Sequence, residues 1–150
     1  MAAGDLVVFN QAKMWLADGT MDLDDTTSDQ YKVALITTLP LVTETTPILA
    51  TFTEVTGGGN YTTGGESIVI TTGSWAESSG TVTFDTATNP QWLQNASNPT
   101  DARAAVFYRD GTHNSITDPF LLMVDLGGVI DMTAGDLTIT WNASGLFTLA

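Results

Sequence analysis

Short runs of β-branched and aromatic residues, separated by Gly, Pro and Asn, recur along this chain from residue 30 onward. Such runs are typical of β-strands, and the separating residues are typical of turns. We interpret seven or eight runs as strands, including residues 30–37, 67–72, 81–85, 102–109, 119–126, 137–141 and, as a final edge, 147–149. The pattern predicts a mainly β domain, an antiparallel β-sandwich or jelly-roll-like fold.

One amphipathic segment precedes these runs. Val8, Ala12 and Trp15 recur at spacings of three and four, and Asp18 and Gly19 offer a stop. We therefore expect one short N-terminal helix over about residues 5–17. An α+β layout, with this helix packed on one open antiparallel sheet, is the alternative.

The length of 150 residues predicts a single domain over residues 1–150. A hydrophobic content of 43% and four Trp indicate a folded chain rather than a disordered one. The absence of Cys excludes disulfides and, with one His, the usual structural zinc sites. No apolar run reaches the roughly 18–20 residues of a membrane span, and the amino end lacks the features of a secretory signal.

The charge of the chain restricts its partners. Seventeen acidic residues face only four basic ones, giving a formal net charge of −13. Such a chain cannot neutralise a track of phosphates, so we expect no nucleic-acid partner and no membrane partner. A neutral or basic partner, or another protein, fits better.

The chain is poor in groups for acid–base catalysis. Its one histidine, His113, lies in a polar turn, and no Gly-x-Ser-x-Gly elbow is present. Any two of the seventeen acids could meet, but nothing in the sequence selects a pair. We expect no catalytic residues, no enzymatic activity and no cofactor.

The densest group of carboxylates, residues 22–29, does not match a calcium loop. An EF-hand loop needs glycine at its sixth position and an acidic ligand at its twelfth, where this chain has Thr27 and Val33. We therefore interpret the segment as a solvated loop and expect no metal site. A cation shared between molecules stays open.

The aromatic residues allow two interpretations. Tyr61, Trp75, Trp92 and Tyr108 could form a platform for stacking sugars, as in carbohydrate-binding modules. Trp141, however, alternates with threonine as core residues of strands do. We favour the core or an interface for the set.

Several short motifs occur in an order that resembles a family of small structural proteins of tailed bacteriophages. The motifs lie at residues 7–13, 19–23, 31–35, 59–65, 104–108, 118–122, 125–128 and 137–142, and so extend through nearly the whole chain. The resemblance implies a virion component without catalytic residues.

The resemblance and the charge together suggest a capsid decoration (cement) protein. It would bind the major capsid protein on the capsid exterior, because acidic charge keeps it away from packaged DNA and suits basic patches of the shell. A tail or neck subunit, as a tube or adaptor protein, is the first alternative. A carbohydrate-binding adhesion module is the second.

Two apolar segments are candidates for contact with a partner. One contains Leu6, Val7, Val8 and Phe9, which are apolar on more than one face of the expected helix. The other contains Phe147 and Leu149. We expect both to be buried against neighbouring copies, and by analogy with the family we expect a homotrimer.

Overall fold

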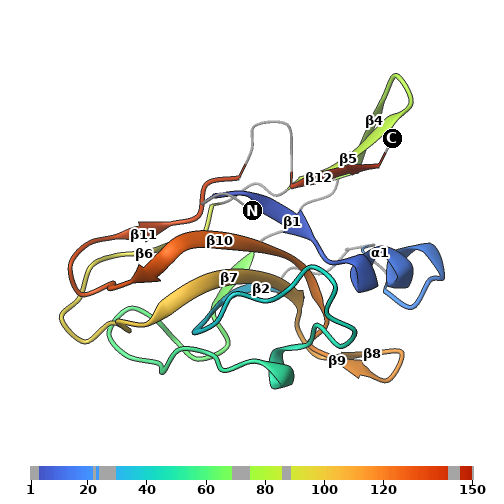
Figure 1. Cartoon of the computed structure of the whole chain (residues 1–150). Coiled ribbons are helices and arrows are strands. Elements are labelled where there is room, and N and C mark those ends of the chain that lie inside the picture. The colour runs from blue at the N-terminus through green and yellow to red at the C-terminus, as the bar shows by residue number, and fades with distance from the viewer. Residues whose placement is uncertain are drawn as a thin grey trace.

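A computed structural model describes residues 4–21, 23, 30–68, 75–85, 89–141 and 146–149 of the chain. Its centre is a five-stranded antiparallel sheet in the order β1-β10-β7-β2-β3 (Figure 1). The strands are β1 (Leu6–Val8), β2 (Tyr31–Ile36), β3 (Glu66–Ile68), β7 (Ala102–Arg109) and β10 (Phe120–Ile130). The described part is mainly β with one short α-helix, as the sequence predicts.

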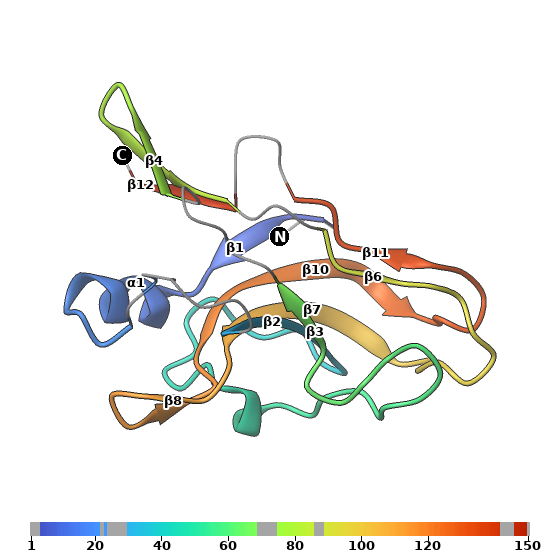
Figure 2. The ribbon, with the colours of Figure 1, turned by 180° about the vertical axis from the view of Figure 1, so that it is seen from behind.

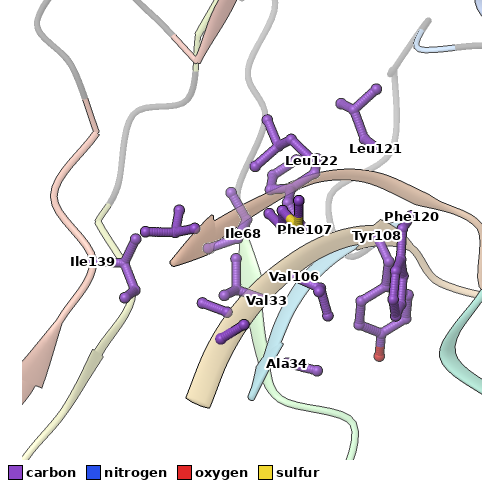
Figure 3. Packing of buried hydrophobic residues seen from close by; sticks show 14 of the residues in the cluster. Val33, Ala34, Ile68, Val106, Phe107, Tyr108, Phe120, Leu121, Leu122 and Ile139 are labelled. Atoms are coloured by element: carbon purple, nitrogen blue, oxygen red, sulfur yellow. The ribbon is translucent and has the colours of Figure 1, made fainter. Parts of the chain in front are cut away.

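The middle strands of this sheet are apolar on both faces. Phe107 of β7 lies between Val33 of β2 and Leu122 of β10, so these three share one face. Tyr108 and Phe120, which also pair, lie on the opposite face. Side chains on both faces are buried, and Figure 3 shows them packed around β2, β7 and β10.

Different segments cover the two faces. Tyr31 and Phe107 stack with ring centroids 5.5 Å apart, and Phe84 and Trp141 approach them at 6.4 and 6.3 Å. On the other face, the ring of Phe120 lies 5.8 Å from that of Phe9 and 5.4 Å from that of Phe52. The core therefore extends on both sides of the sheet.

Smaller sheets surround the central one. β11 (Leu137–Thr138) pairs with β6 (Gln91–Trp92), and β8 (Thr112–His113) pairs with β9 (Ile116–Thr117). A three-stranded sheet joins β12 (Phe147–Leu149), β5 (Thr81–Phe84) and β4 (Trp75–Ser78). This sheet, called the arm below, projects away from the central sheet in both views (Figures 1 and 2). Phe84 is fully buried at its root, whereas residues 76–80 are exposed.

The expected helix over residues 5–17 is wrong in its first part. α1 spans Asn10–Ala17, and the preceding residues form β1, which pairs antiparallel with β10. Phe9, at the junction, is extended, with φ −61° and ψ 140°. Pairing with a strand more than a hundred residues away decides this conformation, and the local apolar spacing does not reveal it.

Two further strands, β10 and β4, differ from those expected. β10 continues through Gly127 and Gly128 to Ile130 by a register shift, with Gly127 at a φ of 80°. β4 lies within the segment expected to connect strands, and its turn to β5 uses Ser79 and Gly80 at positive φ. A 3₁₀ turn, η1 (Leu49–Thr51), lies in the connection between β2 and β3.

Candidate functional site

The first group of expected partner residues lies at the edge of the central sheet. Leu6, Val7 and Val8 form β1 and are half-buried. Phe9 is fully buried and packs against Phe120, so the expectation that it contacts a partner is wrong. The change from strand to helix at Phe9 directs its ring into the core.

The second group lies on another sheet. Phe147 and Leu149 belong to β12, where their registered partners on β5 are Phe84 and Val82. The side chains of Phe147, Leu149 and Trp75 lie outside the described part of the structure. The structure thus places the two expected groups on β1 and on the arm, and their role at an interface stays a prediction.

All four basic side chains of the chain have partners within the molecule. Lys32 Nζ lies 2.7 Å from the Asp110 carboxylate, and Arg103 pairs with Asp125. The remaining two donate to side-chain amides: Arg109 to Gln30 at 2.9 Å, and Lys13 to Asn10 at 3.3 Å. Two of the four cations are thus neutralised by carboxylates, and the net charge that the protein presents to a partner is acidic.

The pair of Arg103 and Asp125 is the more buried of the two ion pairs. The Asp125 side chain is 7% exposed, and its carboxylate also accepts a hydrogen bond from the Gly127 N–H at 2.7 Å. The Arg103 guanidinium, followed by the Gly127 N–H, holds the pKa of Asp125 below its usual range. This carboxylate is thus fixed where β10 leaves its register with β7.

His113 has structural contacts. It begins the turn of the β8–β9 hairpin, and its Nε2 lies 3.1 Å from the Asp110 backbone carbonyl. Asn114, the next residue, donates from its side chain to the Thr20 carbonyl at 2.9 Å. Among the described residues, no contact joins His113 to a serine hydroxyl or a carboxylate, so the geometry offers no hydrolase triad there.

The carboxylate segment 22–29 lies outside the described residues except for Leu23, so its interpretation as a solvated loop stays a prediction. Within the described residues, no three His, Asp or Glu side chains gather as metal ligands would.

The Trp and Tyr residues considered for a sugar-stacking platform are core residues wherever their side chains are described. Tyr61, Trp92 and Tyr108 are at most 3% exposed, and Trp141 is 8% exposed. The rings of Tyr61 and Trp92 pack against each other at 5.8 Å. This confirms the core interpretation for these four and removes them from a sugar-stacking surface.

A polar network that the sequence did not reveal joins the glycine-rich loop to the central sheet. The Tyr61 hydroxyl donates to Glu54 Oε1 at 2.6 Å and accepts from the Leu35 N–H at 2.9 Å. Glu54 Oε1 also accepts from the Gly64 N–H, while the Tyr108 hydroxyl donates to the Gly64 carbonyl. Burial raises the pKa of both tyrosines above the usual value.

The tight packing of this loop explains why position 65 is occupied by glycine. Gly65 has a φ of 77°, and a Cβ at this position would lie 2.0 Å from the Val33 carbonyl oxygen. Nearby, the buried Asn98 accepts from the Asn60 N–H and donates to the Leu93 and Met132 carbonyls. The density of glycine in residues 57–65 indicated a loop, but no local signal identified Glu54 or Asn98 as its anchors.

Within the ranges that the structure describes, large apolar side chains are exposed at four separate places. Met14, Leu41, Leu93 and Val129 are each more than half exposed. They lie on different segments, and isolated exposed apolar residues are normal on a protein surface. In the described part of the chain, no helix has the length and apolar character that a membrane span requires.

Comparison with protein-family models, with curated proteins and with solved structures finds no match to this chain.

Proposed function

We propose that this protein is a non-enzymatic virion structural protein, a decoration protein that binds the outside of a tailed-phage head and stabilises it. Its partner is the major capsid protein, and its location is the capsid exterior. The order of short motifs along the chain supports this assignment. Several of them fall on β2, β7, β10 and the glycine-rich loop, which build the core.

The observation that carries the proposal is the arrangement of charge. The chain has a net charge of −13, and each of its four basic side chains is already engaged within the molecule. Packaged DNA repels such a surface, whereas basic patches on the outside of a shell attract it. Surface ion pairs contribute only about 0–1 kcal/mol each, so attachment also needs apolar contacts.

Imaging of purified virions that contain the protein tests the proposal. We expect copies at regular positions on the outer surface of the head. Copies confined to the tail or neck would instead support the alternative of a tube or adaptor subunit. Absence of the protein from intact virions, measured by mass spectrometry, would contradict both.

A binding assay with purified head shells adds a test of the charge argument. We expect the protein to sediment with shells and binding to weaken as salt is raised, because salt screens pairs between its acids and shell cations. Binding that is unchanged by salt would show that charge does not direct the attachment.

A further inference from the structure

β1 is the last strand on one side of the central sheet, as far as the described residues show. The Phe9 N–H donates to the Leu121 carbonyl at 3.1 Å, in register with the pairing of Val8 with Leu122. Residues of antiparallel strands alternate between pairs that exchange hydrogen bonds and pairs that do not. Val7 therefore bonds toward β10, and the backbone groups of Leu6 and Val8 face away from it.

These outward groups, called the β1 edge below, are the N–H and C=O groups of Leu6 and Val8. β1 is the last strand of the sheet, and the described part of the chain supplies no hydrogen-bond partner for these groups. Unpaired backbone groups in a row form a template for a further strand. The chemistry of the β1 edge thus fits an extended segment.

The β1 edge also lacks three of the features that protect sheet edges, although the strand is short. Its sequence, Leu-Val-Val, contains no charge and no proline, and its register with β10 has no shift. The opposite edge of the sheet differs, because β3 carries Glu66, which accepts a hydrogen bond from the Gln91 N–H at 3.1 Å. Of the two edges, β1 is the apolar one, and no described segment covers its outward backbone groups.

We propose that the β1 edge pairs antiparallel with the β1 edge of a second copy of this chain. Centred on Val7, this pairing places Leu6 of each copy opposite Val8 of the other. All four outward groups of one copy then meet complementary groups of the second. The two central sheets become one continuous sheet across a two-fold axis.

The charges near β1 favour this antiparallel arrangement. Asp5 comes to lie opposite Phe9 of the second copy, near the start of the helix that carries the exposed Lys13. The two Asp5 residues are then four positions apart, about 13 Å along the strands, which exceeds the Debye length at physiological salt. Parallel pairing would set Asp5 beside Asp5.

The pairing holds whether or not the protein belongs to a virion, and it concerns three of the residues already expected at an interface. It differs from the expected homotrimer, because an antiparallel pair of identical strands closes as a dimer.

Sedimentation equilibrium of the purified protein tests this inference with two substitutions at one position. Leu6→Pro removes the outward N–H, a change that edge strands tolerate, whereas Leu6→Ala shortens the side chain and keeps the N–H. We expect a reversible dimer for the original chain, a dissociation constant raised at least about tenfold for Leu6→Pro, and a smaller change for Leu6→Ala. A chain that stays monomeric, a trimer, or equal dimers for both variants would overturn the proposal.

Amide hydrogen exchange of the unaltered protein gives an independent measurement if Leu6→Pro does not fold. The Leu6 and Val8 amides should be more protected at high than at low protein concentration. The Val7 amide, which faces β10, should be protected at both. Exchange at Leu6 and Val8 that does not depend on concentration would contradict pairing at the β1 edge.

Discussion

The Tyr61 hydroxyl makes two hydrogen bonds in a nearly water-free position. It satisfies the buried Leu35 N–H and binds Glu54, which in turn holds the Gly64 N–H. The Tyr108 hydroxyl donates one hydrogen bond, to the Gly64 carbonyl. Removing one hydroxyl at a time therefore compares two losses of stability. Without the Tyr61 hydroxyl a buried N–H has no acceptor, and without the Tyr108 hydroxyl a carbonyl loses one donor.

We expect Tyr61→Phe to lower the free energy of unfolding by about 1–3 kcal/mol, because it leaves the Leu35 N–H without an acceptor. Tyr108→Phe is the matched control and should cost less, since an under-satisfied carbonyl is tolerated better than an orphaned N–H. Urea denaturation measures both. Equal losses, or a larger loss for Tyr108→Phe, would contradict this role of Tyr61.

The Asp125 carboxylate should stabilise the protein at neutral pH and lose that contribution in acid. Its pKa is held below the unfolded value by Arg103 and by the Gly127 N–H. Its contribution is therefore fully present above the unfolded pKa of about 3.9 and is lost as pH falls through the lower folded value. Asp125→Asn should reduce stability at neutral pH and make stability fall less steeply on acidification.

The partner of Asp125 provides the control for that measurement. Arg103→Gln should flatten the acid-side profile in the same way, and the double variant should lose less than the sum of the two single losses. Additive losses in a double-mutant cycle would show that the pair does not act as a unit.

Among the elements, the arm meets the core at Phe84. Phe84 at the end of β5 is fully buried, and its ring lies 6.4 Å from that of Tyr31 in the central sheet. The Leu146 N–H donates to the Phe84 carbonyl at 2.8 Å, which joins the entry to β12 to the same point. Phe84 therefore fixes both β5 and β12.

Phe84→Ala should cost about 3–5 kcal/mol of unfolding free energy, as expected for removing a buried aromatic ring. Val82→Ala, two residues along the same strand and half-buried, should cost clearly less. Thermal or urea unfolding provides the comparison. Similar losses for the two variants would show that the arm is not rooted through Phe84.

The sequence predicted elements best where the local pattern and the tertiary environment agree. The strand expected at residues 102–109 has the same bounds as β7, and that expected at 30–37 contains β2. Residues 6–8 misled because their apolar spacing suits a helix, while their conformation depends on β10. The strand expected at residues 119–126 was predicted to end before Gly127 and Gly128, but glycine permits a bulge within a strand as readily as the end of one.

The candidate site was predictable only in part. The sequence singled out Leu6, Val7 and Val8 for their apolar side chains. The groups that could pair with another strand are instead backbone N–H and C=O groups, and only the sheet order reveals which of them face outward. Phe9 was grouped with them because sequence alone cannot separate a buried ring from an exposed one at a junction. Glu54 and Asn98 gave no signal, because their partners are set by loop packing.

For the whole molecule, the net charge of −13 should give opposite salt dependence to two kinds of contact. Two copies repel each other, and raising salt from about 0.05 to about 0.5 M shortens the Debye length and weakens that repulsion. Self-association should therefore strengthen with salt, while binding to a basic shell weakens. Sedimentation equilibrium and shell binding over the same salt series measure both, and parallel trends would contradict the charge argument.

The pairing of Leu6 with Val124 also bears on how the protein folds. Closing this ladder joins residues from nearly opposite ends of the chain, and such closure is slow because the entropy of a long loop must be lost first. β10 also pairs with β7, which is much nearer in sequence, so we expect that pairing to form before β1 docks on β10. Folding intermediates would therefore lack a completed β1 edge, so the surface for a second copy would form late and premature association through it would be avoided.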